Sequence, residues 1–305
     1  MALRIEPVTE DFAAFASGVD LGQPLDAETL GAFVAGMDRY AVMIFRDQSL
    51  TQTQQVALAR QLGPPDTALD KVLRNFQTRM EYAEVSDISN VDMTGNVAPR
   101  DHRQAMMNIG NRIWHTDSSF MHYPWRYSIL YAVTAVGRGG ETQWADLRAA
   151  YDALDPEDKM MVEALVAEHF AGQSRALLGQ TDGSEAERSI FPPVRWPLVR
   201  SHAGSGRKLL FVTSAIREII GMSLPEGRAL VAELLEHATQ REFLFTHAWR
   251  PGDLAIWDNR AVIHRGKRFD MTERREMRRV ATVDDVPSLP IADAERTRIY
   301  GQPCI

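Results

Sequence analysis

Short apolar runs separated by polar turns recur along the chain and predict a β-rich core. The run 40–45 ends at Arg46-Asp47-Gln48 and has the pattern of a strand buried on both faces. The same pattern predicts further elements: strands at 127–133, 141–144, 252–259 and 279–283, a short apolar element at 261–264, and a hairpin of 198–202 with 208–212. Short strands without regular alternation with helices favour an antiparallel sandwich or barrel over a doubly wound fold.

Apolar residues at helical spacing predict helices in the intervals between these strands. The segment 50–62 stops at Gly63-Pro64-Pro65, and 223–238 begins with the capping-box pair Ser223 and Glu226. Two more helices are expected at 147–154 and 156–169. His169 and His237 fall among charged residues of these helices, so both are expected to be surface imidazoles.

A polar, irregular stretch at about 67–111 interrupts this pattern. It is long for a loop inside a compact domain, and such loops usually form a lid or a binding segment. We therefore expect one domain over 1–305, mainly β with flanking helices, with a lid or substrate loop at 67–111.

Composition and charge narrow the class of protein. The 305 residues are 45% hydrophobic and 25% charged, which is ordinary for a globular protein. A net charge of −7 gives no basic field for a nucleic acid, and no apolar run approaches the roughly 18 residues of a membrane span. We expect a cytoplasmic protein that binds neither nucleic acid nor a membrane. The single cysteine, Cys304, excludes an intrachain disulfide, so a bound metal must use N and O ligands.

A pair of metal-binding side chains stands out at His115-Thr116-Asp117. Residues i and i+2 of an extended segment point to the same side, so both can bind one ion, although such pairs also arise by chance. His264, after a later apolar run, is a candidate third ligand. Two imidazoles and one carboxylate leave three octahedral positions open, which suits Fe(II) oxygenases. Zinc hydrolases use the same ligand types, so the three residues alone do not select iron.

Two residues near these ligands suggest a site for a dicarboxylic 2-oxo acid. Arg275 lies eleven residues after His264, which is far enough for a return strand to bring its guanidinium beside the metal. The planar guanidinium matches a carboxylate in a bidentate manner, and Thr142 could add a hydroxyl. An acid that chelates iron at one end needs such an anchor at the other.

Five motifs together resemble the TauD/TfdA family of Fe(II)- and 2-oxoglutarate-dependent dioxygenases, in order and spacing over nearly the whole chain. The motifs are Trp114–Phe120, Gly139–Thr142, His202–Lys208, Trp257–Arg260 with His264-Arg265, and Arg275 with Arg279. Four further stretches look most like the 2,4-dichlorophenoxyacetate dioxygenases within that family: 82–90, 148–154, 237–243 and 278–282. Taurine dioxygenases are a more distant match.

The resemblance implies a double-stranded β-helix, the jelly roll of cupin-like proteins. It also implies roles for eight residues: His115, Asp117 and His264 as catalytic iron ligands, Thr142 and Arg275 on the distal carboxylate of 2-oxoglutarate, and Arg279, Asn111 and Lys71 on the substrate. Alternatives stay open for some of them. Asn111 is also suited to capping a turn, Lys71 to a solvated loop, and Arg274 and Arg278 compete with Arg275 and Arg279 for the inward direction.

The implied reaction uses Fe(II), 2-oxoglutarate and O2 to hydroxylate an aryloxyalkanoate such as 2,4-dichlorophenoxyacetate next to the ether oxygen. The products would be a phenol and glyoxylate, with succinate and CO2. The partner is thus a small anionic aromatic substrate, and a homo-oligomer is expected. Alternatives are the same chemistry on a taurine-like sulfonate or an alkyl sulfate, a zinc hydrolase, or a metal-binding protein without catalysis.

Overall fold

The structure is a computed structural model that describes residues 2–67, 78–99, 109–179 and 191–291. Lys71 therefore lies outside the described residues, as do 68–77 and 100–108 of the expected substrate loop. The part of that loop at 78–99 lies beside the large sheet and adds a short strand to its edge.

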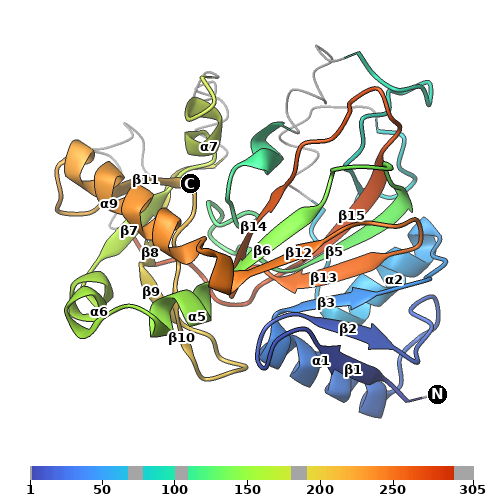
Figure 1. The fold of residues 1–305 in the computed structure, drawn as a ribbon, viewed down its shortest axis with the longest axis horizontal. Helices are drawn as coiled ribbons and strands as arrows, with labels where there is room; N and C mark the ends of the chain where they lie inside the picture. The colour runs from blue at the N-terminus through green and yellow to red at the C-terminus, as the bar shows by residue number, and fades with distance from the viewer. Residues whose placement is uncertain (1, 68–77, 100–108, 180–190, 292–305) are drawn as a thin grey trace.

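Seven strands form one large, mostly antiparallel sheet, in which only the β2–β3 pair is parallel. Figure 1 shows it running across the right half of the molecule. The strands, in spatial order, are β1 (Arg4–Pro7), β2 (Ala14–Ser17), β3 (Val42–Phe45), β13 (Leu254–Asp258), β5 (Trp125–Thr134), β15 (Glu276–Val283) and β4 (Ser86–Asp87). Residues of β3 and β13 are all buried, which explains why their sequences are continuous apolar runs rather than alternating ones.

A second sheet packs against one face of the first and completes a sandwich. Its strands, in spatial order, are β12 (Leu244–His247), β6 (Thr142–Asp146) and β14 (Val262–Gly266). Aromatic rings fill the space between the sheets, with the Trp144 ring 5.7 Å from Trp257 and 5.8 Å from Phe245. This arrangement is the double-stranded β-helix that the resemblance predicted.

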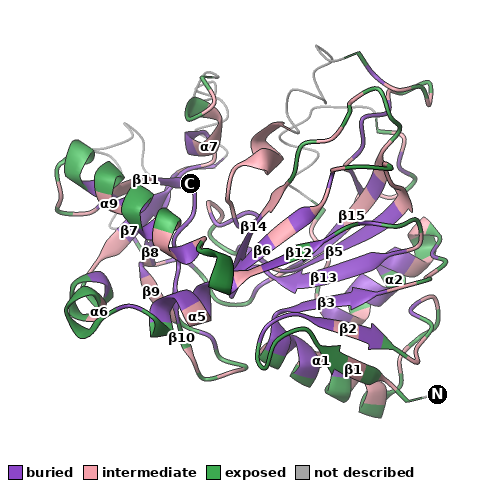
Figure 2. Cartoon of the chain, in the orientation of Figure 1, coloured by how far each residue is buried: buried purple, intermediate pink, exposed green. Residues whose placement is uncertain are grey.

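Two helices cover the outer face of the large sheet, α1 (Ala27–Tyr40) and α2 (Gln52–Leu62). The side chain of Thr51 caps α2 and forms a capping box with Gln54, and the helix ends at Gly63 as its sequence predicts. The sequence patterns did not identify α1, β1 or β2. Figure 2 shows how these helices expose one side and bury the other against the strands.

A separate layer of short elements covers the outer face of the smaller sheet. Its members are α5 (Leu147–Asp152), α6 (Pro156–Glu163), β7 (Val166–His169), α7 (Gln173–Ala176), β8 (Val194–Pro197), β9 (Val199–Ser201), β10 (Lys208–Leu210), β11 (Ile216–Ile219), α9 (Leu224–Ala238) and the 3-10 turn η2 (Arg241–Phe243). Within the described ranges, no helix is long and apolar enough to cross a membrane.

One expected helix is wrong in its second half. The helix predicted over 156–169 ends at Glu163, and 166–169 form strand β7 between β8 and β11. Pairing on both sides outweighs the weak helical spacing there. His169 is consequently fully buried, not a surface imidazole, and its ring stacks on Phe211 at 5.3 Å. His237 lies in α9 as expected but is half-buried, and its Nε2 donates to the Ala150 carbonyl.

One buried arginine connects α1 to the layer beyond the smaller sheet. Arg148, at the start of α5, is fully buried and pairs with Asp146 at 2.9 Å. Its remaining N–H groups donate to the carbonyls of Asp38 and Arg39 at 3.0 Å, and of Asp11 at 3.1 Å. The guanidinium thereby satisfies carbonyls at the C-terminal end of α1, which no intrahelical donor reaches.

Candidate metal centre and active site

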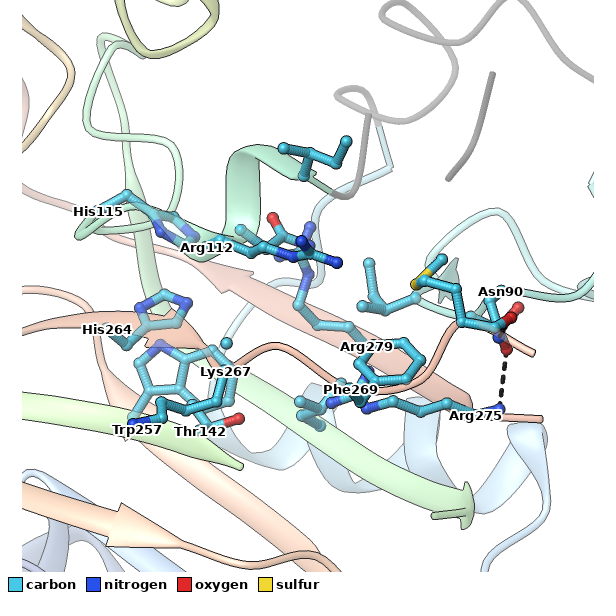
Figure 3. Close-up of a pocket in the computed structure, with 17 residues that line it drawn as sticks. Asn90, Arg112, His115, Thr142, Trp257, His264, Lys267, Phe269, Arg275 and Arg279 are labelled. Carbon is cyan, nitrogen blue, oxygen red and sulfur yellow. Dashed lines mark hydrogen bonds between the residues drawn. The ribbon is translucent and has the colours of Figure 1, made fainter. Parts of the chain in front are cut away.

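His115, Asp117 and His264 meet at one end of the sandwich, although His264 follows Asp117 by 147 positions along the chain. Backbone hydrogen bonds in both directions join His115 to His264, which lies in β14, at 3.0 and 2.7 Å. Nε2 of each histidine lies 3.8 Å from a different oxygen of Asp117. Figure 3 shows the two imidazoles facing the same space. The geometry therefore offers two nitrogens and a carboxylate to a single ion.

The protonation states of these groups suit a divalent metal. Burial lowers the pKa of His115 and brings that of His264 to about 3, so both imidazoles are neutral at physiological pH. Burial opposes ionisation of Asp117, but Arg279 and the two histidines outweigh it and hold its pKa at about 2. Nδ1 of His115 lies 2.8 Å from the Ile113 carbonyl, which fixes its hydrogen there and leaves the Nε2 lone pair free.

Hydrogen bonds also hold the carboxylate of Asp117 in place. Ser128 Oγ donates to Oδ2 at 2.7 Å, and Arg279 Nη1 donates to Oδ1 at 3.0 Å. Asn259 Nδ2 in turn donates to Ser128 Oγ at 2.9 Å, and its Oδ1 accepts from the Trp257 indole at 3.0 Å. Asn259 thereby orients the carboxylate through Ser128.

A pocket opens beside these ligands, and its described lining holds cations but no acidic side chain. The residues that line the pocket, drawn in Figure 3, are Ile88, Ser89, Asn90, Ile109, Asn111, Arg112, His115, Leu130, Thr142, Trp257, His264, Gly266, Lys267, Phe269, Met271, Arg275 and Arg279. Four of them are cationic and several are apolar. Such a lining suits a ligand that combines negative charge with an apolar body.

Thr142 and Arg275 both line the pocket; Figure 3 shows Thr142 beside Trp257 and below His264, and Arg275 extending from the far side next to Asn90. Burial lowers the pKa of Arg275 only to about 10, so the guanidinium remains charged at neutral pH. Among the described residues, its guanidinium makes one hydrogen bond, from Nη2 to the Gly140 carbonyl at 3.5 Å, while its backbone N–H donates to Asn90 Oδ1 at 2.8 Å. A buried guanidinium with so little compensation favours an anionic ligand.

The structure separates the four competing arginines. Arg275 and Arg279 both line the pocket, even though β15 carries a register shift at 276–277. Arg274 is exposed and pairs with Glu276, and Arg278 donates to the Leu50 carbonyl on the other face of the sheet. Asn111 lines the pocket in the 3-10 turn η1 (Ile109–Arg112).

Several pocket residues were not identified from the sequence. Arg112, Lys267, Asn90 and Phe269 line the pocket but belong to no motif with recognisable chemistry. Arg112 and Lys267 could have been found only through their closeness in sequence to His115 and His264. Asn90 comes from a segment that no periodicity connects to the site.

Comparisons with known proteins agree with this geometry. Residues 4–281 match the family model described as taurine catabolism dioxygenase TauD, TfdA family. An α-ketoglutarate-dependent 2,4-dichlorophenoxyacetate dioxygenase of Cupriavidus pinatubonensis is 49% identical over 285 residues, which cover 93% of this chain and 99% of the relative. An (S)-phenoxypropionate/α-ketoglutarate-dioxygenase of Sphingobium herbicidovorans is 36% identical over 285 residues, 90% and 93% of the two chains.

A solved structure shows the same fold. The crystal structure of AAD-2 in complex with Mn(II) and N-oxalylglycine superposes with a TM-score of 0.87 at 38% identity, covering 95% of this chain and 100% of that one. The resemblance inferred from the motifs is thereby confirmed, and the chain belongs to the TauD/TfdA family of dioxygenases.

Proposed function

We propose that this protein is an Fe(II)- and 2-oxoglutarate-dependent dioxygenase that hydroxylates an aryloxyalkanoate, such as 2,4-dichlorophenoxyacetate, next to its ether oxygen. The hydroxylated carbon then releases a phenol and leaves glyoxylate, while 2-oxoglutarate becomes succinate and CO2. The observation that carries the proposal is a site of two neutral histidines and one carboxylate beside a cation-lined, partly apolar pocket.

The metal ligands would be His115, Asp117 and His264. Two imidazole nitrogens and one carboxylate on one side of an ion are the donor set of non-haem Fe(II) oxygenases. Iron bound there would supply, together with 2-oxoglutarate and O2, the oxidation of a substrate C–H bond to C–OH. The protein supplies ligand orientation through Ser128 and the Ile113 carbonyl.

Arg275 and Thr142 would bind the distal carboxylate of 2-oxoglutarate. The buried guanidinium offers a bidentate, charge-assisted contact, and the Thr142 hydroxyl offers another donor nearby. A dicarboxylic acid anchored there has its other end directed toward the metal ligands.

Arg279 would bind the anionic group of the substrate, with Asn111 and Lys71 as further contacts. The position of Arg279 beside Asp117 supports this role, because an anion there lies next to the metal. The apolar wall of Ile88, Ile109 and Met271 gives an aromatic ring a complementary surface. The predicted lid at 67–111, the homo-oligomer and the cytoplasmic location stay predictions.

The second candidate is the same chemistry on an alkyl sulfate or a sulfonate. An α-ketoglutarate-dependent sulfate ester dioxygenase of Pseudomonas putida is 32% identical over 296 residues, and Arg279 could bind such an anion equally well. A panel of aryloxyacetates, sulfonates and alkyl sulfates, scored for substrate-dependent succinate, separates the two. Succinate formation that needs O2 and Fe(II), and that Zn(II) does not support, supports the dioxygenase; equal turnover with Zn(II) would refute it.

A further inference from the structure

The hydroxyl of Thr142 accepts a hydrogen bond from a tryptophan that does not line the pocket. Trp249 Nε1 lies 3.0 Å from Thr142 Oγ1, and both residues are buried. An indole N–H can only donate, so the Thr142 oxygen must be the acceptor. One lone pair of the hydroxyl is thereby occupied, and its own hydrogen remains for another partner.

The surroundings of Trp249 hold its ring in one position. The ring contacts His247 edge to face, with centroids 5.0 Å apart. His247 Nε2 bonds to Asp253 Oδ2 at 2.9 Å, and Arg46 pairs with the same carboxylate at 3.1 Å. In the β12–β6 pairing, His247 lies directly opposite Thr142, so the chain reaches Trp249 just beyond the paired strands.

We propose that Trp249 is a positioning residue for the co-substrate: it fixes the Thr142 hydroxyl as a hydrogen-bond donor to the distal carboxylate of a 2-oxo dicarboxylic acid. This inference rests on the proposed function, in which Arg275 binds the same carboxylate. Without the indole N–H, the Thr142 hydroxyl can rotate and donate its hydrogen to another acceptor instead of the carboxylate. Preorganised donors lose less rotational freedom on binding, so removing Trp249 should weaken binding even though it touches no ligand.

The proposal distinguishes ligands with and without a second carboxylate. 2-Oxopentanoate has the same carbon chain as 2-oxoglutarate but ends in a methyl group, which accepts no hydrogen bond. Loss of the Trp249 donor should therefore affect 2-oxoglutarate and leave 2-oxopentanoate unchanged. A purely structural role would weaken both ligands alike.

The test is a double-mutant cycle of Trp249→Phe and Thr142→Val, with binding to the Mn(II)-loaded protein measured by calorimetry. We expect 2-oxoglutarate to bind about 10-fold more weakly to Thr142→Val and about 5-fold more weakly to Trp249→Phe. The double variant should bind no more than about 2-fold more weakly than Thr142→Val, because the two residues act as one unit. For 2-oxopentanoate, all four proteins should agree within about 2-fold.

Trp144→Phe is the matched control. Trp144 is a fully buried tryptophan in β6, the strand that carries Thr142, and its indole N–H has no hydrogen-bond partner within the described part of the chain. The control therefore removes the same volume without removing a hydrogen bond, and should bind 2-oxoglutarate as the wild type does. Additive losses, or equal losses for both ligands in Trp249→Phe, would overturn the proposal.

Two further variants keep the outcome interpretable. If Trp249→Phe does not fold, Thr142→Ser decides instead: it should retain the wild-type preference for 2-oxoglutarate over 2-oxopentanoate, and a loss equal to that of Thr142→Val would overturn the proposal. Arg275→Ala tests the proposed function separately. If it weakens both ligands equally, the distal carboxylate is not bound there and the proposed function fails at that point. If only Arg275→Ala is selective for 2-oxoglutarate, the role of Trp249 alone is refuted.

Discussion

Replacing Ser128 with alanine should weaken metal binding without touching a metal ligand. The side chain is fully buried and lies between Asn259 and Asp117. Because Asn259 Nδ2 donates to Ser128 Oγ, the Ser128 hydrogen is directed at Asp117 Oδ2, 2.7 Å away. Ser128→Ala removes this donor and also leaves the Asn259 amide without its acceptor.

Two independent arguments give the size of the effect. A hydrogen bond to a charged acceptor contributes about 1.5–3 kcal/mol. Loss of a group that orients a metal ligand typically costs about 10- to 100-fold in affinity, or about 1.4–2.7 kcal/mol. Arg279 still holds Oδ1 of Asp117, so the carboxylate keeps its charge and loses only orientation. We therefore expect a dissociation constant for Mn(II) that is about 30-fold higher.

The assay is a titration of the metal-free protein with Mn(II), in which binding is measured by calorimetry or by the electron paramagnetic resonance signal of free Mn(II). Ser119→Ala is the control, because Ser119 is equally buried and its hydroxyl has no partner among the described residues. The control should bind Mn(II) as the wild type does. A dissociation constant for Ser128→Ala within about 2-fold of the wild type would refute the reasoning.

Three more predictions concern substrate, pH and stability. At saturating Fe(II), which offsets the loss of the Arg279 contact with Asp117, Arg279→Ala should raise the Michaelis constant for an aryloxyacetate by about 10-fold or more and leave that for 2-oxoglutarate nearly unchanged, whereas Arg278→Ala should change neither; steady-state kinetics that show the reverse would reassign the role. Burial lowers the pKa of His169 to about 3, so on acidification the imidazole is protonated in the unfolded chain before it is protonated in the folded protein. The free energy of unfolding therefore decreases as the pH is lowered past ~6.5. Denaturant unfolding should show that the wild type loses about 2 kcal/mol more than His169→Phe between pH 7 and pH 5, and equal losses would contradict this. Arg148→Met should lower the free energy of unfolding by about 3–5 kcal/mol, because the Asp146 carboxylate is left buried without its guanidinium partner. A loss below about 1 kcal/mol would show that the contacts of Arg148 contribute little to stability.

The sequence predicted the parts of the fold that carry strong local signals. Continuous apolar runs predicted strands β3, β5 and β13, and the capping box at Ser223 predicted helix α9. Helix α1 was missed although its sequence carries the signal: Asp26 caps it, and Phe33, Met37 and Tyr40 recur at helical spacing and are buried. Strand β7 was assigned to a helix because its pairing with β8 and β11 is not visible in the local sequence.

For the site, sequence spacing brought His115 and Asp117 together and suggested His264 and Arg275. The three ligand groups do lie within reach of one ion. The supporting residues could not be found in this way, because hydrogen-bonding partners such as Ser128 and Trp249 depend on strand register. The pairing of β5 with β13 places Ser128 opposite Trp257, close to Asn259, and no motif records that neighbour.

The two walls of the pocket differ in a way that bears on how such enzymes diversify. His264, Thr142 and Arg279 lie on strands paired within two sheets, so moving any of them disturbs the whole sandwich. Ile88 and Asn111 come instead from the segment after β4 and from the turn η1, and both side chains are only partly buried. Mutations at these positions can reshape the substrate space at low structural cost. A library confined to 88 and 109–112 should therefore yield altered substrate preference on an unchanged reaction, whereas Asn90, whose side chain holds the backbone of Arg275, should not tolerate change.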